Sequence, residues 1–332
     1  MAKVVRFPSF GGPEVLQLDD CAVADPGPGE VRVRVAAFGL NRVETLYRSG
    51  GLGPVRFPAT IGYEAAGVID AVGADVPRWQ PGDRVATLYG LSMEHYGTHG
   101  ETILYPADML VAVPDAQPLV EAAASWMMYG TAYALVEVGR ISRGDMVVIT
   151  AASSSVGVAA IQIANDFGAV PVAITRTRQK AARLIELGAA HVIVSDEESP
   201  AERIMAITQG KGARIVFDAV AGPPLAELLT ATAPLGVVIV YGMLGGYSVD
   251  LALPALMVNN LTLRGFSADL LIAQPESRAR VVDYVSFGVK RGALKPVIDR
   301  TFDLSQIVEA HRYLEGNGQA GKIVVTTRNA SA

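Results

Sequence analysis

The stretch MVVITAASSSVGVAAIQIA, residues 146–164, is typical of a buried strand, a tight turn of small residues and an apolar helix. At such a turn the first amides of the helix can meet a phosphate at close range, and the helix dipole favours negative charge. The candidate contacts are Ser153, Ser154, Ser155, Val156 and Gly157. The stretch therefore predicts a pyrophosphate-binding turn, and the alternative is an ordinary core strand and helix.

Basic side chains follow the next predicted strand, residues 170–174. That strand ends about 20 residues after the turn, where a carboxylate would bind the adenine ribose 2′-hydroxyl. The segment instead provides Thr175, Arg176, Thr177, Arg178 and Lys180. Guanidinium and ammonium groups suit a 2′-phosphate. The segment therefore favours NADPH over NADH, and the alternative is a basic, solvated helix start.

An alternation of strands and helices surrounds these two motifs. Strands are predicted over residues 147–150, 170–174, 191–194, 214–217, 236–241 and 261–265, with helical patterns between them. This alternation predicts an α/β fold with a doubly wound parallel sheet. Because ligands of such sheets lie beyond the carboxyl ends of the strands, we expect Tyr241, Gly242 and Phe266 to line the site.

The rest of the chain has a different pattern. Up to about residue 120, short β-like runs alternate with frequent Gly and Pro, which predicts a compact, mostly β unit. A helix is predicted from Pro275 to about Lys290. A strand over residues 323–326 is expected to return to the first domain. If the β unit packs over the sheet edge, the nicotinamide would lie between the domains.

Composition limits the possible function classes. The 332 residues suffice for two domains with sizeable cores. With 18% charged residues, a net charge of −5 and no long run of Lys or Arg, a nucleic-acid surface is not indicated. Neither a signal segment nor an uninterrupted membrane-spanning run is evident, so we expect a cytoplasmic protein with no membrane contact. The only cysteine, Cys21, excludes an intrachain disulfide and a multi-thiolate zinc site.

Several short motifs in a fixed order carry a resemblance to a known family. They are GLN at 39–41, IGYEAAGV at 61–68, WQPGDRV at 79–85, GTAY at 130–133, the turn at 151–157 and GKIV at 321–324. With them the chain resembles the zinc-free, quinone oxidoreductase-like branch of the medium-chain dehydrogenase/reductases over essentially its whole length. The resemblance implies a mostly β GroES-like catalytic domain over residues 1–120 and 291–332, and a dinucleotide-binding Rossmann domain over residues 121–290.

The resemblance also bears on metal binding. Zinc alcohol dehydrogenases of the same fold have a cysteine near position 39 and a histidine where Tyr63 stands. This chain has Gly39 and Tyr63, so the usual ligands of an open tetrahedral zinc site are missing. We therefore expect no catalytic metal. The pair His95 and His99 is interpreted as ordinary surface or loop histidines.

Asn41 and Tyr63 are the candidate catalytic residues. By the resemblance, Asn41 lies near the nicotinamide and would donate to a carbonyl or hold the cofactor. The alternative is a turn-forming Asn after a strand. Tyr63 should face the cleft, either as a hydrogen-bond donor and proton source or as part of an apolar wall. Quinone reductases of the family often have a tyrosine at the position of Leu46, and here Tyr47 stands beside it.

The resemblance implies further cofactor contacts. Thr131 matches a threonine beneath the cofactor, and Lys180 matches a lysine on the 2′-phosphate. Ser195 stands where some NADPH-dependent members have a tyrosine beside that phosphate. Asn317 and Lys322, in the returning tail, are expected to close over the nicotinamide. For Lys322 the alternative is a solvated charge at a strand end.

Aromatic and methionine side chains are expected around the cleft, because several lie near predicted loop ends. The pocket candidates are Tyr47, Tyr63, Tyr89, Met93, Tyr96 and Met243. They would form an apolar pocket for an aromatic or conjugated substrate. The alternative is that they form core between the domains.

The predicted reaction follows from the cofactor and the missing metal ligands. Reduction must then rely on placement of the hydride acceptor and on hydrogen bonds to the oxygen that gains charge. The sequence therefore predicts an NADPH-dependent oxidoreductase of quinones or α,β-unsaturated carbonyls. Alternatives are a metal-free ketone or aldehyde reductase that uses Tyr63 as proton donor, and a non-catalytic NADPH-binding protein. The resemblance also implies a homodimer through the strand at residues 261–264.

Overall fold

The computed structural model describes residues 1–251 and 253–331 and divides the chain into two compact units. Unit 1 comprises Met1–Met127, Asp269–Val282 and Pro296–Ala332, and unit 2 comprises Met128–Ala268 and Asp283–Lys295. The domain boundaries at residues 120 and 290 stay a prediction. Residues 269–282 fall in unit 1 because their side chains bond there: Asp269 pairs with Tyr63, and Arg278 pairs with Asp108.

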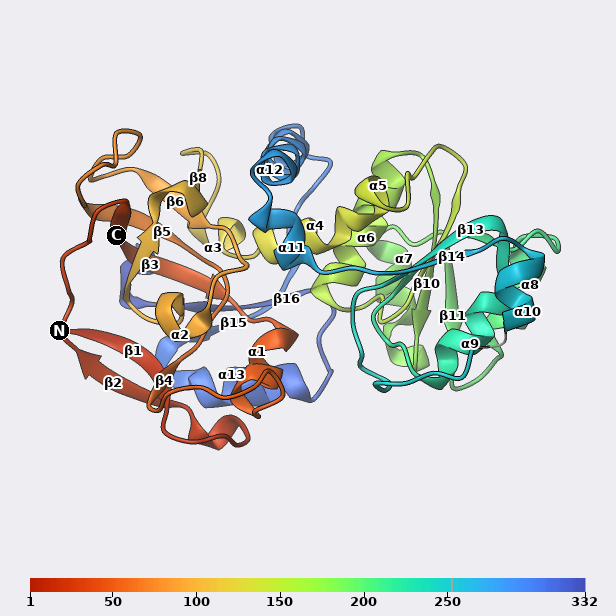
Figure 1. Cartoon of the computed structure of the whole chain (residues 1–332), viewed down its shortest axis with the longest axis horizontal. Coiled ribbons are helices and arrows are strands. Elements are labelled where there is room, and N and C mark those ends of the chain that lie inside the picture. Colours follow the sequence, from red (N-terminus) through yellow and green to blue (C-terminus); the bar gives the residue numbers. More distant parts are fainter. Residues whose placement is uncertain (252, 332) are drawn as a thin grey trace. The chain divides into compact units, whose positions relative to one another are not determined.

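Unit 2 is built on a parallel sheet (Figure 1). Within the described residues its strands are β9 (Met146–Ile149), β10 (Val170–Thr175), β11 (His191–Val194), β12 (Ala213–Asp218), β13 (Thr232–Val240) and β14 (Thr262–Gly265). They lie in the order β11-β10-β9-β12-β13-β14, and all neighbouring pairs are parallel. This is the order of a doubly wound dinucleotide-binding sheet, so the predicted fold class is confirmed.

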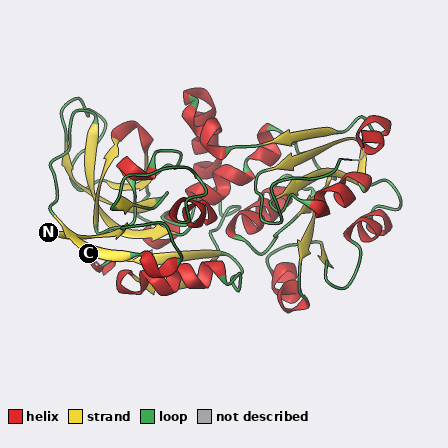
Figure 2. Cartoon of the chain, turned by 60° about the horizontal axis from the view of Figure 1, so that its bottom comes forward, coloured by secondary structure: helices red, strands yellow, loops and turns green. Residues whose placement is uncertain are grey.

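The apolar runs of unit 2 form strands because both faces of the sheet are covered. Val148, Val172, Ile193, Val216 and Val238 are each at most 1% exposed. Side chains buried on both faces make a strand a continuous hydrophobic run rather than an alternating one. Figure 2 shows helices on both sides of these strands. Because neighbouring strands all run parallel, their carboxyl ends lie at the same edge of the sheet.

The helices vary widely in length. The α-helices are α1 (Arg42–Arg48), α2 (Met93–Tyr96), α3 (Leu119–Ala122), α4 (Trp126–Ala132), α5 (Ala134–Glu137), α6 (Ser155–Asp166), α7 (Ala181–Glu186), α8 (Pro200–Ile207), α9 (Pro223–Thr230), α10 (Leu253–Val258), α11 (Ala268–Ala273), α12 (Pro275–Lys290) and α13 (Ile307–Glu315). Short 3-10 helices are η1 (Pro13–Val15), η2 (Ala107–Met109), η3 (Arg178–Lys180), η4 (Leu304–Gln306) and η5 (Arg328–Ser331). The predicted helix over 275–290 is α12. No helix in the described part of the chain has both the length and the apolar character needed to cross a membrane.

Unit 1 is mostly β, as predicted. A small sheet contains β2 (Gln17–Cys21), β1 (Ala2–Phe7) and β4 (Ala59–Thr60). A larger sheet has the order β15 (Ile298–Asp303), β16 (Lys322–Thr326), β3 (Glu30–Gly39), β5 (Ala65–Val72), β6 (Arg84–Thr87) and β8 (Leu110–Ala112), and β7 (Thr102–Pro106) also pairs with β3. Strand β16 pairs antiparallel with β3, which confirms that the tail returns to the first domain.

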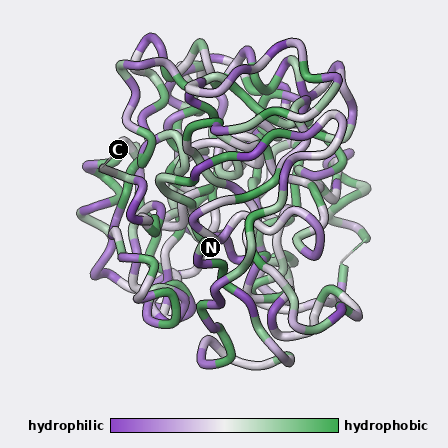
Figure 3. Tube along the Cα trace, turned by 90° about the vertical axis from the view of Figure 1, so that its left-hand side faces the viewer, coloured by the Kyte–Doolittle hydropathy of each residue, from purple (hydrophilic) through white to green (hydrophobic). Residues whose placement is uncertain are grey.

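Strand β3 shows why this part of the sequence alternates. Val31, Val33 and Val35 are at most 1% exposed, whereas Arg32 and Arg34 between them reach solvent. A strand with one buried and one solvated face requires this period of two. Coloured by hydropathy, the trace in Figure 3 has many hydrophilic segments in the loops at its periphery. The end of β3 leads directly into Asn41 and α1.

Candidate active site

In unit 2 a turn of small residues joins β9 to α6. Ser154 is the N-cap of α6, and its Oγ accepts a hydrogen bond from the Gly157 amide at 3.0 Å. A Cβ on Gly157 would lie 2.5 Å from the carbonyl oxygen of Ala152, so only glycine allows helix and strand this approach. The turn places the first amides of α6 at the carboxyl end of β9, the position that suits a phosphate.

The cations of the basic segment after β10 differ in their partners and exposure. Lys180 Nζ donates to Ser153 Oγ at 3.0 Å, which places an ammonium beside the turn. Arg178 instead pairs with Glu197, with 3.1 Å between Nε and Oε1. Arg176 is exposed directly after β10. Lys180 and Arg176 are therefore the better placed of the predicted 2′-phosphate ligands, because the carboxylate of Glu197 occupies the Arg178 guanidinium.

Other predicted cofactor residues gather at the ends of neighbouring strands. The Tyr241 amide donates to Asp218 at 2.9 Å, and its ring stacks on Phe217 with 4.0 Å between centroids. A Cβ on Gly242 would lie 2.6 Å from the carbonyl oxygen of Ala219. Phe266 follows β14 and donates its amide to Val240 at 2.8 Å. These residues lie after the carboxyl ends of β13 and β14, beside that of β12.

The remaining predicted residues of unit 2 differ in burial. Thr131 lies in α4 and is 5% exposed. Thr175 is also buried, and its backbone carbonyl accepts from the Ser195 amide at 2.9 Å. Met243 is 51% exposed. Its exposure distinguishes it from the buried aromatic candidates of unit 1.

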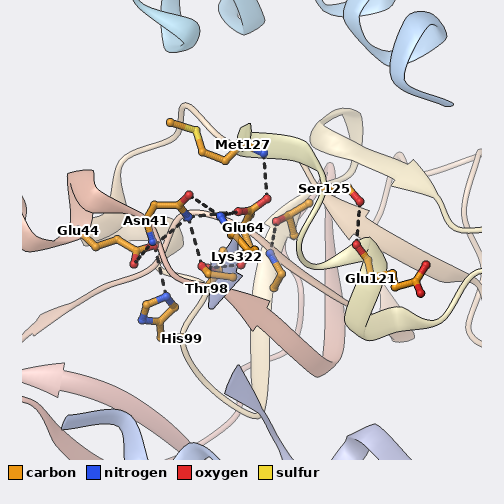
Figure 4. A network of polar contacts seen from close by, with 12 residues as sticks. Asn41, Glu44, Glu64, Thr98, His99, Glu121, Ser125, Met127 and Lys322 are labelled. Carbon is orange, nitrogen blue, oxygen red and sulfur yellow. Dashed lines mark hydrogen bonds and ion pairs between the residues drawn. The ribbon is translucent and has the colours of Figure 1, made fainter. Parts of the chain in front are cut away.

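In unit 1, Asn41, Glu64 and Lys322 form a buried polar network (Figure 4). Lys322 Nζ donates to Asn41 Oδ1 at 2.6 Å and forms an ion pair with Glu64. The other carboxylate oxygen of Glu64 accepts from the Met127 amide at 2.9 Å. All three network residues are at most 7% exposed. The alternative of a solvated charge at Lys322 is therefore wrong.

The amide of Asn41 is held from several directions. Its Nδ2 lies 3.2 Å from the Gly39 carbonyl and 3.3 Å from carboxylate oxygens of Glu44 and Glu64. Its backbone amide donates to Glu44 Oε2 at 2.9 Å, an arrangement typical of the start of a helix. Asn41 thus caps α1, and donation to a substrate would require it to exchange one of these contacts.

Gly39 makes room for the ammonium of this network. A Cβ at this position would lie 2.5 Å from Lys322 Cε and 2.9 Å from Glu64 Oε1. The place beside Tyr63 therefore contains an ammonium and an engaged carboxylate instead of a thiolate and an imidazole. An ammonium has no lone pair for a metal, and both oxygens of the Glu64 carboxylate are already engaged, so these residues do not provide the three ligands of a catalytic zinc ion.

Tyr63 is paired with a carboxylate that the sequence did not indicate. Its hydroxyl donates to Asp269 Oδ2 at 2.6 Å, and its ring stacks on Tyr89 with 6.4 Å between centroids. Burial, followed by the charge of Asp269, raises the pKa of Tyr63 far above its ordinary value. Burial also raises the pKa of Asp269, against the opposing effect of the hydrogen bond from Tyr63. The structure thus joins a phenol and a carboxyl group whose pKa values are both raised.

The other aromatic candidates of unit 1 are distributed more widely. Tyr47 is buried edge-on against Phe7, with 5.7 Å between ring centroids. The Tyr96 hydroxyl donates to Glu30 at 3.0 Å, at the opposite end of the ten-residue strand β3 from Asn41. The structure therefore joins Tyr63 and Tyr89 and directs Tyr96 to another partner.

Two candidates in unit 1 remain, Met93 and Asn317. Met93, at the start of α2, is 5% exposed, and its carbonyl accepts from Thr60 Oγ1 at 2.5 Å. Asn317 follows α13 and accepts a hydrogen bond from Arg42, the residue after Asn41. The structure thus brings the tail beside the start of α1.

A second buried cluster consists of Glu44, His99 and His311, whose ligand-type atoms all lie within 4.8 Å of one another. His99 and His311 are at most 1% exposed, so the interpretation of His99 as an ordinary surface or loop histidine misses its burial. Arg48 Nη1 lies 3.0 Å from His311 Nδ1. Because a guanidinium only donates, Nδ1 accepts and neutral His311 carries its proton on Nε2. That nitrogen then has no lone pair for a metal, so the cluster does not fit a cation.

Comparison with known proteins agrees with this architecture. Residues 27–115 match the alcohol dehydrogenase GroES-like domain, and residues 155–282 match the zinc-binding dehydrogenase family. The chain is 33% identical to a quinone oxidoreductase of Pseudomonas aeruginosa, over 98% of this chain and 99% of the relative. It is 32% identical to a 2-haloacrylate reductase of a Burkholderia species, over 98% of each chain.

A solved structure supports the same assignment. The Escherichia coli quinone oxidoreductase complexed with NADPH superposes with a TM-score of 0.89 and 28% identity, over 98% of this chain and 99% of that one. Identity of about one third over the full length, the close superposition and the family matches in both units have one explanation. The chain belongs to the medium-chain dehydrogenase/reductase family, in its quinone oxidoreductase branch.

Proposed function

We propose that this protein is an NADPH-dependent reductase of quinones or α,β-unsaturated carbonyls that works without a catalytic metal. The observation that carries the proposal is the buried ion pair between Lys322 and Glu64 beside Gly39. This pair stands where a zinc site would need free ligands, so we assign hydrogen bonding to the substrate to the hydroxyl of the neighbouring Tyr63. The names of the relatives support the substrate class, since quinones and haloacrylates are both conjugated carbonyl compounds.

The cofactor assignment rests on unit 2. NADPH, when bound, supplies a hydride from its nicotinamide. The turn at residues 153–157 would hold the pyrophosphate, and Arg176 and Lys180 would hold the 2′-phosphate. Further proposed contacts are Asn41, Thr131, Thr175, Arg178, Tyr241, Gly242, Phe266, Asn317 and Lys322. Among these, Arg178 contributes least because Glu197 already pairs with it.

In unit 1 the residues would stabilise the charge that develops on the substrate. Hydride addition to a conjugated carbonyl moves negative charge to oxygen, so one well-placed donor lowers the barrier. The Tyr63 hydroxyl is the proposed donor, and donation to the substrate would require it to exchange its present hydrogen bond to Asp269. Asn41 and Lys322 would keep the end of β3 and the start of α1 in place through their mutual hydrogen bond of 2.6 Å.

The proposal is tested by following NADPH oxidation by chelator-treated protein with 1,4-benzoquinone, a cyclic enone and the matching saturated ketone. The expected result is chelator-resistant turnover of the conjugated acceptors and little turnover of the ketone. Failure to oxidise NADPH with any conjugated acceptor would reject the proposal. A preference for the ketone that Tyr63→Phe abolishes would instead select the metal-free ketone or aldehyde reductase, which the Tyr63–Asp269 pair also supports.

Cofactor choice needs its own comparison. We expect Arg176→Ala combined with Lys180→Ala to lower kcat/KM for NADPH with little effect on NADH, because only NADPH has the 2′-phosphate. Arg183→Ala is the matched control, since Arg183 is an exposed cation that pairs with Glu186 and is not among the proposed contacts. Equal rates with NADPH and NADH in the unaltered protein would contradict the assigned preference.

We also propose that the protein forms a homodimer through β14, the edge strand of the unit 2 sheet. In α10, the helix that precedes β14 in the chain, Leu253, Met257 and Val258 are 61%, 74% and 78% exposed. An open strand edge next to apolar side chains favours pairing with a second chain. Two copies of β14 related by a twofold axis would cover both features.

A further inference from the structure

We propose that Asp269 is the proton reservoir of Tyr63, a positioning residue that returns a proton to the tyrosine after the tyrosine has protonated the substrate. The inference deepens the proposed function and rests on it. Its basis is the 2.6 Å contact between Tyr63 Oη and Asp269 Oδ2, which joins residues 206 positions apart. Tyr63 precedes β5, and Asp269 lies in the first turn of α11. The fold therefore brings together two groups from distant segments.

The surroundings hold this pair in a fixed arrangement. A Cβ on Gly90 would lie 3.5 Å from Asp269 Cα, so the segment after β6 packs against the backbone of Asp269. Tyr89, the residue before Gly90, stacks on the Tyr63 ring and is fully buried. The titratable groups that face the Asp269 carboxyl are thus Tyr63 and Tyr89, and Glu64 in turn acts on Tyr89 through its charge.

Tyr63 and Asp269 differ in exposure, and a proton relay requires the outer group to reach solvent. Tyr63 is 7% exposed, whereas Asp269 is only partly buried. A buried phenolate would be costly, because burial raises the pKa of Tyr63. A neutral Asp269 carboxyl in contact with the phenol oxygen removes that cost by returning a proton at once. The raised pKa of Asp269 favours this neutral form.

The reaction balances with these groups. The acceptor gains one hydride, which the proposed cofactor supplies, and one proton. When Asp269 is neutral, its Oδ2–H can donate to the Tyr63 oxygen, which reverses the hydrogen bond that Tyr63 donates in the structure and frees the Tyr63 proton. The Tyr63 O–H bond then breaks as its proton moves to the substrate atom that has gained the electron pair. The Asp269 O–H bond breaks next, and its proton restores the Tyr63 hydroxyl. Water then protonates the Asp269 carboxylate, so each turnover consumes one NADPH and one proton from solvent.

The kinetic test compares Asp269→Asn with the unaltered protein, using a cyclic enone as acceptor. We expect wild-type kcat to fall as pH rises through the folded-state pKa of Asp269, because only the neutral carboxyl can return a proton. Asp269→Asn should lower kcat by on the order of 100-fold, remove this pH dependence and leave the KM for NADPH unchanged. Asp299→Asn is the control, since Asp299 pairs with Tyr313 at 2.8 Å in an exposed tyrosine–aspartate contact.

A second measurement does not depend on turnover. Infrared difference spectra of wild type against Asp269→Asn should show a neutral carboxyl band that persists above the ordinary pKa of aspartic acid, because burial raises the pKa of Asp269. Loss of that band at the ordinary pKa would overturn the inference. So would an Asp269→Asn variant with the wild-type rate and pH profile, while enone turnover by wild type would leave the proposed function standing. A wild type that reduces no acceptor would overturn both.

Discussion

At the scale of single residues, the ammonium of Lys322 holds several parts of unit 1 together. It contacts Asn41 at the start of α1 and Glu64 before β5, while Glu64 also accepts from the Met127 amide. All of these polar groups are buried, so each depends on the others for its partners. Removing one member should therefore cost more than the loss of one exposed ion pair.

We predict that Lys322→Met destabilises the protein by about 3–5 kcal/mol, because it leaves the Glu64 carboxylate buried without its cation. Urea unfolding monitored by circular dichroism measures the change. The double variant Glu64→Gln with Lys322→Met should recover most of the loss, since a neutral amide can still accept from Met127. Lys3→Met is the control, because the Lys3–Asp20 pair is exposed. Equal midpoints for Lys322→Met and Lys3→Met would contradict the buried network.

His311 gives the pH dependence of stability a definite sign. Burial, with the nearby His99 and Arg48, lowers the pKa of His311 well below its ordinary value. In the unfolded chain a histidine titrates near 6.5, so below that pH the unfolded state binds more protons. Stability should therefore be fully present above about pH 6.5 and fall by up to about 1.4 kcal/mol per unit below it.

The measurement for His311 is urea unfolding across pH 5 to 8 for wild type and His311→Asn. The asparagine can still accept from Arg48 through its side-chain oxygen. The variant should lose the part of the pH dependence of the unfolding free energy that His311 contributes. Asp269 contributes in the opposite direction, because its raised pKa favours the folded state at lower pH. This contribution is the same in both proteins and cancels in the difference between the two curves. Parallel curves would contradict a neutral, buried His311.

At the scale of elements, strands were predictable where burial gives them a pattern. The apolar run of β9 is typical of a buried strand, and the alternating run at the start of β3 is typical of a half-buried one. Strand β15 was missed because its sequence, IDRTFD, is charged and mostly exposed. It lies at the edge of its sheet, where only one neighbouring strand constrains it. Hydrophobic period alone does not distinguish such a strand from a loop.

Strand β14, at the edge of the unit 2 sheet, leads to a prediction about assembly. We expect the protein to sediment as a dimer and Val258→Glu to shift it toward monomer, because the charge would be buried in the proposed interface. Leu52→Glu is the matched control, since Leu52 is 51% exposed in unit 1. A wild type that sediments as a monomer at all concentrations would reject the dimer, as would equal effects of the two substitutions.

At the scale of the whole molecule, the sequence indicates single site residues more readily than the residues they contact. The turn at 151–157 and the motif around Tyr63 were recognisable because each is local. The pairs Asn41–Lys322 and Tyr63–Asp269 span 281 and 206 positions, and only the fold brings them together. Asp269 in particular has no local pattern that separates it from a surface carboxylate. The family resemblance indicated Asn41 and Lys322 as site residues but not their mutual contact.

The proposed reaction is metal-free hydride transfer to a conjugated acceptor. Its most direct test is the fate of deuterium from NADPH labelled at nicotinamide C4, with chelator-treated protein and a cyclic enone. We predict that deuterium appears on the β-carbon of the saturated ketone product, at a rate that added zinc does not change. Deuterium on the carbonyl carbon, or turnover that requires zinc, would contradict it.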